Sequence, residues 1–468
     1  MAHAALPARG VLRRDRGVGR EPAPRRGPHA PDAGRLPQER QHGDVALDPG
    51  GRRVSGSPGL PQLPTLSLAE RDRRWGLLRE MMRRNDVECL LVPPAPVRYP
   101  ADTYFTNDIP GSAVVLPLEG EPVAIQRGAS VAGSWLQAQE WGEGSWIPDM
   151  RFGPRAPAMV RVLEEMGLAQ SRIGTIGILS GPNLLPYGWT PQPMWAYLQK
   201  ELPKATFVDV LDDFTGIWLV KSDEELALFR YVSQLAEQAC QVMLDVTRPG
   251  VSEVEIYAAV LHEFHRHGAG MAHDLFVHSG PDNLSWDAPR WLYRAQAPRV
   301  VQEGDMVLSE MMPTVGGLEA QVQMCVAVGD VHPDFHRASE VARESYEAGL
   351  EALRPGVKFG EVADAMAEPL QRAGAWHITP LIHSLTPLTM VGRVTRGTDR
   401  SITDRFKQVD ELPGTDLDVV LEPGMTFQLE PDAVFGRRQV NIGGNVIVTE
   451  DGHEELNSLP TCIRFART

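Results

Sequence analysis

An internal repeat is the feature that most constrains the fold of this 468-residue chain. The motif Arg-Pro-Gly-Val occurs at 248–251 and again 106 residues later at 354–357, and at the same offset Glu255 matches Glu361. Each copy begins with a helical pattern, breaks at Pro-Gly, continues as a second helix and then enters strand-like sequence. Two such copies predict two halves related by a pseudo-twofold axis, with a ligand cavity between them.

The residues before the repeat alternate between strand and helix patterns. Ser67 and Glu70 have the spacing of a helix-capping box, and apolar residues follow at helical intervals. Apolar runs that predict strands occupy 87–92, 113–118, 122–125, 173–179 and 206–210, and helical patterns occupy 156–168 and 191–201. This alternation predicts an α/β domain at 65–215. A second capping box at 221–225 opens a helix to about Val246, within a second domain at 216–468.

Charge and composition set the first 64 residues apart from the rest of the chain. Residues 1–64 are rich in Arg, Pro, Gly and Ala, which predicts a disordered tail. Residues 1–60 hold 11 arginines and 6 acidic residues, a net charge of about +5. Because the whole chain has a net charge of −15, the residues after position 60 carry about −20. An acidic body argues against nucleic acid as a partner, because phosphate binding requires a basic face.

The cysteines and the hydropathy pattern predict a cytoplasmic protein. The four cysteines form no CxxC pair and lie among apolar neighbours, which is typical of buried free thiols in a reducing compartment. No run of 18 apolar residues is present, and the N-terminus lacks the apolar core of a secretory signal. We therefore expect no membrane partner.

Four polar side chains stand out at the ends of extended segments. Glu310 and Gln321 flank the turn at 313–317, an arrangement that directs both side chains into one cavity. His383 follows the second repeat, and Glu430 ends the extended run Leu421–Pro431. Such a set can hold metal ions or grip a small polar substrate.

Several longer motifs carry a resemblance to a known family. The chain resembles the pita-bread family of creatinase, prolidase, aminopeptidase P and methionine aminopeptidase over about residues 67–468. The motifs are KSDEEL at 221–226, RPGVSEVE at 248–255, EPGMTFQLEP at 422–431 and VIVTEDGHEELN at 446–457. The resemblance implies an α/β (α+β) protein, with a smaller N-terminal creatinase-type domain before a pseudo-twofold pita-bread catalytic domain. It also implies a homodimer.

The same resemblance assigns metal-ligand positions that this chain fills poorly. Metal-dependent members hold two ions with two aspartates, a histidine and two glutamates, and these positions fall on Glu310, Gln321, His383, Glu430 and Gly443. Two adjacent divalent ions need bridging carboxylates, whereas an amide is neutral and glycine has no side chain. We therefore expect no cofactor, or at most a single weakly bound divalent ion.

Creatinase indicates how such a pocket can work without metal. The working histidine of creatinase falls here on Asp287, preceded by Trp286, so the comparison does not transfer at that residue. His383 is instead expected to transfer the proton, because the pKa of an unperturbed histidine lies near neutrality. Glu430 or Glu310 would orient this histidine, and the other carboxylate would bind a cationic group of the substrate.

Further residues are predicted to bind substrate, and two alternatives concern other histidines. Gln321, Asp287 and Trp286 are expected in the pocket, together with His278 at a strand end. His377 is an alternative to His383. The three histidines 262, 265 and 267 share one helix and are expected at the surface. The polar stretch 391–418 is either a lid or a surface insertion.

Three functions agree with these residues. The favoured one is a metal-independent, creatinase-like enzyme that hydrolyses a C–N bond, or catalyses a related elimination, in a small polar nitrogen-containing substrate. The second is an Xaa-Pro metallopeptidase with an atypical metal site. The third is a non-catalytic protein that binds small molecules or peptides.

Overall fold

The computed structural model describes residues 60–96, 99–181, 187–394 and 413–467. The predicted N-terminal tail falls almost entirely outside these residues. Residues 57–468 form one compact unit. None of its described helices is both long enough and apolar enough to span a lipid bilayer.

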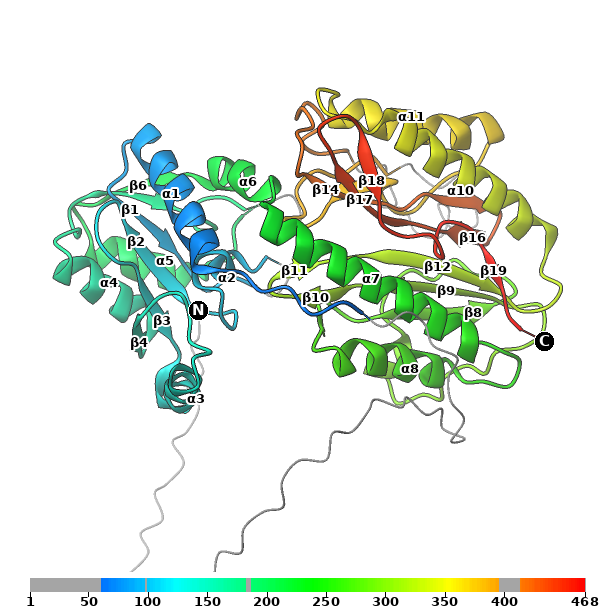
Figure 1. Ribbon diagram of the computed structural model, residues 1–468, viewed down its shortest axis with the longest axis horizontal. Coiled ribbons are helices and arrows are strands. Elements are labelled where there is room, and N and C mark those ends of the chain that lie inside the picture. Colours follow the sequence, from blue (N-terminus) through cyan, green and yellow to red (C-terminus); the bar gives the residue numbers. More distant parts are fainter. Residues whose placement is uncertain (1–59, 97–98, 182–186, 395–412, 468) are drawn as a thin grey trace, which may run out of the picture. The chain divides into compact units, whose positions relative to one another are not determined.

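A six-stranded mixed sheet organises the first part of this unit (Figure 1). Its strand order is β4-β3-β2-β1-β5-β6; β2 is antiparallel to both of its neighbours, and the other pairs are parallel. The strands are β1 (Cys89–Val92), β2 (Ala113–Pro117), β3 (Val123–Gln126), β4 (Asp149–Phe152), β5 (Arg172–Thr175) and β6 (Thr206–Asp209). Strands β1, β2, β3 and β6 coincide closely with apolar runs that predicted strands. Strand β5 occupies only the first part of its predicted run.

Helices cover both faces of this sheet. The helices are α1 (Leu68–Arg84), α2 (Ala101–Thr106), α3 (Gly128–Glu140), α4 (Arg155–Glu165), α5 (Gln192–Glu201) and α6 (Leu211–Leu219). Successive residues of β1 point to opposite faces: Leu90 packs in the core shared with α1 and α6, and Leu91 in the core shared with α4 and α5. The predicted boundary at 215/216 falls inside α6, so the domain limits stay a prediction.

The internal repeat is visible as two helical hairpins (Figure 1). The four helices are α7 (Asp223–Val246), α8 (Glu253–Arg266), α10 (Pro333–Ala352) and α11 (Phe359–Ala373). The glycines at the two breaks have nearly the same backbone conformation, with φ +87° at Gly250 and +83° at Gly356. A left-handed conformation of this kind favours glycine, so the repeated Pro-Gly motif determines how both hairpins turn.

Two four-stranded sheets follow the hairpins, in the orders β19-β12-β9-β8 and β13-β14-β17-β18. The remaining short elements are α9 (Arg290–Tyr293), β7 (Gly270–Met271), β10 (Pro313–Val315), β11 (Leu318–Glu319), β15 (Asp432–Phe435) and β16 (Arg438–Asn441). The sheet strands are β8 (Phe276–Gly280), β9 (Met306–Met311), β12 (Val322–Ala327), β13 (Ile382–Ser384), β14 (Thr426–Leu429), β17 (Gly444–Val448), β18 (His453–Glu455) and β19 (Arg464–Phe465).

One backbone bridge joins the two sheets near their centres. Gln323 and Gly443 pair in the antiparallel sense, and each backbone N–H donates to the carbonyl of the other at 3.2 Å. The bridge brings the ends of β9, β12, β14 and β17 together. The predicted two-halved architecture is thus confirmed, and the polar residues at those strand ends lie at its centre.

A buried carboxyl on α2 provides a test of this fold. Asp102 is buried, and its Oδ2 accepts hydrogen bonds from the backbone N–H of Gly111 at 2.6 Å and of Ser112 at 2.8 Å. Burial raises the pKa of Asp102 to about 6, against the opposing effect of these bonds. The neutral acid is therefore favoured in the folded state, and its contribution to stability is lost as the pH rises from 3.8 through about 6.

We expect Asp102→Asn to raise the free energy of unfolding at pH 8 by up to about 3 kcal/mol, with the gain vanishing below pH ~4. Asn keeps an acceptor for both backbone donors and carries no charge to bury. Urea unfolding at several pH values measures the difference between variant and wild type. Asp72→Asn, at an exposed position on α1, is the control. A pH-independent difference for Asp102→Asn would contradict the account.

Candidate active site

Antiparallel pairing of β9 with β12 brings Glu310 and Gln321 together, as the sequence predicts. Glu310 on β9 pairs with Gln323 on β12, and Gln321 immediately precedes β12. The connecting turn passes through Gly316 and Gly317, which have φ +58° and +79°. Residues 321 and 323 are two positions apart, so their side chains leave the strand on the same side.

His383 and Glu430 reach the same place from the other sheet. His383 lies on β13, and Glu430 follows β14, its backbone N–H bonded to the Leu381 carbonyl at 2.8 Å. His383 Nε2 lies 3.5 Å from Glu430 Oε1. His383 Nδ1 lies 3.0 Å from the carbonyl oxygen of Ser384, which can only accept a hydrogen bond. The proton therefore sits on Nδ1, and in the neutral ring Nε2 is an acceptor that faces Glu430.

Amide groups connect the two glutamates. Gln321 Nε2 donates to Glu310 Oε1, and also to Glu430 Oε2 at 3.1 Å. Gln323 Nε2 donates to Glu430 Oε2 at 2.6 Å and to Glu310 Oε1 at 3.4 Å. The side-chain oxygen Oε1 of Gln323 in turn accepts a hydrogen bond from Gln428 Nε2. Two NH₂ groups thus lie between the two carboxylates, and we call these five residues the amide–carboxylate network.

The network is removed from solvent, and this changes the acidity of one member. Glu310 is 5% exposed, Glu430 is 2% exposed, and Gln323 is fully buried. Burial raises the pKa of Glu430 well above its usual value, and the nearby charge of Glu310 adds to this effect. Hydrogen bonds from Gln321 and Gln323 act in the opposite direction. Glu430 therefore holds a proton to a higher pH than an ordinary glutamate does.

A cavity of about 1160 Å³ opens beside the network. Its lining includes Glu310, Gln321, His383 and Glu430, together with the predicted Trp286. The first part of the chain also contributes, through Tyr99, Thr103, Asn107, Asp108 and Trp218. The structure thus brings five of the seven predicted site residues to one cavity, while their chemical roles stay predictions.

The other two predicted residues, His278 and Asp287, are not among those that line the cavity. His278 Nε2 bonds to the backbone carbonyl of Asp287 at 2.6 Å, and Asp287 Oδ1 accepts from the Ala288 N–H at 2.7 Å. The alternative histidine His377 is also absent from the lining, and its Nδ1 lies 2.7 Å from the Thr379 carbonyl. The substrate-binding roles of His278 and Asp287 stay predictions without support from the cavity.

Sequence reasoning missed several residues of the site. Gln323 and Gln428 complete the network, and His273 and Phe276 line the cavity. The sequence did contain a signal for Gln323. It is a second glutamine two positions after Gln321 on a predicted strand, where side chains two positions apart lie on the same side. The contributions of the first domain depend on tertiary packing and have no local pattern.

A buried lysine supports the wall of the cavity. Lys221 donates to the backbone carbonyls of Trp218 and of Leu219, the latter at 3.3 Å, and to that of Thr386 at 2.5 Å. Trp218 and Thr386 both line the cavity. Burial lowers the pKa of Lys221 to about 8. This amine therefore ties the end of α6 to the loop that follows β13.

Known proteins similar to this chain are hydrolases. Residues 227–450 match the profile of the family described as Metallopeptidase family M24. The creatinase of Bacillus sp. (strain B-0618) is 21% identical over 410 residues, covering 85% of this chain and 92% of the relative. The Xaa-Pro aminopeptidase of Escherichia coli (strain K12) is 26% identical over 274 residues, covering 54% and 59%.

Solved structures of this class share the fold. The X-Pro aminopeptidase from Thermotoga maritima MSB8 superposes with a TM-score of 0.66 at 17% identity, covering 84% of this chain and 99% of that one. The prolidase from Pyrococcus horikoshii OT3 gives 0.63 at 17% identity, covering 82% and 98%. The fold is the pita-bread fold with an N-terminal domain. Residues 227–450 thus form a domain of the creatinase, prolidase and aminopeptidase P family, and the chain is an enzyme of hydrolase type.

Membership of this family corrects the prediction about cofactors. The matching family is one of metallopeptidases, so the expectation that this chain has no cofactor is wrong. It then matters whether the side chains at the ligand positions of this chain could coordinate the two metal ions of such a site. Among the described residues, no group of three or more His, Cys, Asp or Glu is arranged to hold a metal ion.

The positions themselves explain why two ions do not fit. A Cβ atom at Gly443 would lie 2.6 Å from Gln323 Oε1 and 2.8 Å from Gln428 Nε2, and it would also overlap the Leu429 carbonyl oxygen. No side chain can therefore stand there without displacing the network. The donors between Glu310 and Glu430 are amide N–H groups, which repel a cation. The residues of this chain do not fit the family's two-metal centre.

We expect Gln323→Glu to lower the free energy of unfolding by about 2–4 kcal/mol at neutral pH, because a third buried carboxylate replaces a donor to two others. Urea unfolding in the presence of a chelator measures the loss. The matched control is Gln371→Glu, an exposed position on α11. Unchanged stability of the Gln323 variant would show that the network does not hold the glutamates as described.

The ligand mismatch also predicts a metal content. After loading with excess Mn²⁺ or Zn²⁺ and removal of free ions, we expect fewer than two equivalents of metal per chain by elemental analysis. A two-metal centre requires bridging carboxylates at an ion separation of roughly 3.5–4 Å, which Gln321 and Gly443 do not supply. Two tightly retained equivalents would contradict the fit test.

Proposed function

We propose that this enzyme hydrolyses a C–N bond in a small nitrogen-containing substrate that carries a cationic group. The observation that carries the proposal is the buried pair His383–Glu430 beside a cavity with an acidic lining. The supporting facts are the geometry of that pair, the charge of the lining and the hydrolase relatives.

The charge of the lining favours a cation. Among the described residues that line the cavity, four are acidic, Asp108, Glu310, Glu319 and Glu430, and none is a lysine or arginine. With Glu430 protonated, the other three carboxylates still attract an ammonium or guanidinium group in this partly enclosed site of low dielectric, and they repel a carboxylate. Phe276 and Trp286 add an edge-to-face aromatic pair at 5.7 Å, against which a planar cation can stack.

His383 and Glu430 can supply the two proton transfers that hydrolysis of a C–N bond requires. His383 Nε2 accepts the proton of a water molecule as its oxygen attacks the carbon of the C–N bond. Glu430, whose raised pKa keeps it protonated, donates its proton to the nitrogen that leaves. Gln321 and Gln323 hold the Glu430 carboxyl in place throughout, because their N–H groups donate to its Oε2.

A second candidate is cleavage of Xaa-Pro peptides, which is favoured by the names of several relatives, including the aminopeptidase of Escherichia coli. A peptide bond is also a C–N bond, and the same pair of residues can serve it. A free dipeptide, however, carries a carboxylate that finds no lysine or arginine in the described lining.

The homodimer and the cytoplasmic location implied earlier stay predictions. Sedimentation of the purified chain tests whether it is a homodimer.

We expect His383→Gln to lower kcat/KM by about 10²–10⁴-fold, the usual contribution of a positioned acid or base. The assay incubates the enzyme with guanidino and amino amides on one side and with Xaa-Pro dipeptides on the other, and mass spectrometry identifies the products. His377→Gln, a buried histidine outside the cavity lining, is the matched control and should keep near wild-type activity. Preferential turnover of Xaa-Pro dipeptides would reject the cationic substrate in favour of the second candidate.

A further inference from the structure

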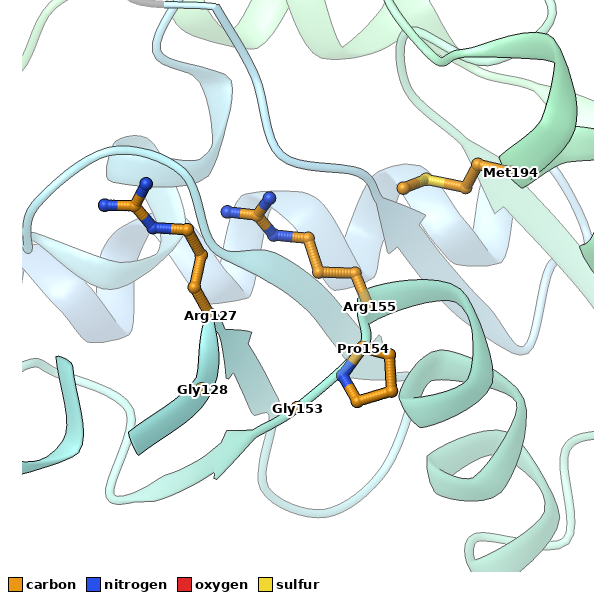
Figure 2. A pocket seen from close by; sticks show the side chains of 6 residues that line it. All are labelled: Arg127, Gly128, Gly153, Pro154, Arg155 and Met194. Atoms are coloured by element: carbon orange, nitrogen blue, oxygen red, sulfur yellow. The ribbon is translucent and has the colours of Figure 1, made fainter. Parts of the chain in front are cut away.

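A shallow, open pocket of about 460 Å³ lies at one edge of the six-stranded sheet (Figure 2). It is lined by Arg127, Gly128, Gly153, Pro154, Arg155 and Met194. Arg127 directly follows the last residue of β3, and Gly153 directly follows the last residue of β4. Because β3 and β4 are parallel neighbours, the pocket lies at their shared carboxyl end.

The helices that follow these two strands pack on opposite faces of the sheet. Trp135 of α3 contacts the core that contains Trp75 and Phe214, whereas Met159 of α4 belongs to the core on the other face. When adjacent parallel strands send their helices to opposite faces, a crevice opens beyond their carboxyl ends, and ligands of α/β proteins bind in such crevices. We call this pocket the β3–β4 crevice.

The two arginines of the crevice form no salt bridge among the residues that the structure describes. Figure 2 shows their side chains extending side by side in the same direction. Arg155 Nη2 donates to the Gly111 carbonyl at 2.6 Å, and Arg155 Nε is buried with no hydrogen-bond partner. Neither Arg127 nor Arg155 forms a salt bridge with any residue that the structure describes, although the Asp102 carboxyl acts on Arg155 electrostatically. The effect of Asp102 on Arg155 is smaller than the opposing effect of Arg127, so positive charge predominates at the crevice.

The backbone of the crevice adds further donors. The helices α3 and α4 have 13 and 11 residues, and both begin at the crevice with no side-chain cap and no acidic residue in the first turn. Their first backbone N–H groups therefore have no side-chain acceptor. A Cβ atom added at Gly128 or Gly153 would meet nothing within 4 Å, so the main chain is open to a ligand there.

We propose that the β3–β4 crevice binds a phosphate group, as the free ion or as a small phosphomonoester. Paired guanidinium groups match the oxygens of a phosphate with parallel N–H···O bonds, and the two helix starts favour a doubly charged anion. The proposal concerns a site in the six-stranded sheet and does not rest on the proposed function.

Calorimetric titration of the full chain with inorganic phosphate and with phenyl phosphate, at constant ionic strength, tests the proposal. We expect saturable binding of at least one of the two, weakened about tenfold or more by Arg127→Gln. Arg155→Gln should have a similar effect. Tighter binding of phenyl phosphate would identify an ester, and tighter binding of inorganic phosphate would identify the free ion. Either result supports the site.

Controls separate the crevice from general charge effects. Arg161→Gln alters an exposed arginine later on α4, outside the crevice lining, and should leave the affinity unchanged. Circular dichroism before each titration shows that the variants are folded. The proposal is overturned if neither ligand binds saturably at millimolar concentration. It is also overturned if Arg127→Gln and Arg155→Gln both bind as the wild type does, or if succinate binds and both phosphates do not.

Discussion

The structure of the candidate active site depends on hydrogen bonds between two amide groups and two buried carboxyl groups. Glu310 and Glu430 come from different sheets and would repel each other if nothing lay between them. The N–H groups of Gln321 and Gln323 each reach both carboxylates and so join the two halves of the protein. Because every member is nearly fully buried, these bonds act in a medium of low dielectric, where both their presence and their loss have large effects.

The same network occupies positions that the resemblance assigns to the metal ligands of the family. In a two-metal centre, cations neutralise the carboxylates. Here amide donors occupy the space between them, and the acidity of Glu430 is lowered by burial and by its neighbour Glu310. A carboxyl that keeps its proton can donate it, so the altered centre retains an acid beside the histidine. The lining of the cavity beyond it includes four acidic residues, and the proposed preference for a cationic substrate follows from them.

Much of the fold could be predicted from the sequence, because its patterns are local. The Pro-Gly breaks, the capping residue Ser222 and the apolar runs of the first sheet gave hairpins, helix starts and strands close to those observed. Helix α3 was not predicted, since none of its residues is buried and its sequence has no clear periodicity. The four central polar residues were found from the family resemblance and from the extended segments predicted beside Glu310, Gln321 and Glu430. The binding roles of His278 and Asp287 stay predictions: His278 Nε2 bonds to the Asp287 carbonyl and Asp287 Oδ1 accepts from the Ala288 N–H, contacts that no sequence spacing encodes.

The close approach of Gln323 and Gly443 constrains how this protein can change. Their backbones are hydrogen-bonded, and the space above Gly443 is filled by the Leu429 carbonyl oxygen and by the side-chain amides of Gln323 and Gln428. Because the nearest of these atoms belongs to the backbone, a smaller residue at 323 or 428 would not by itself make room for a side chain at 443. Every substitution of Gly443 is therefore expected to move the main chain of β14, so variation at this centre is confined to the side chains around it.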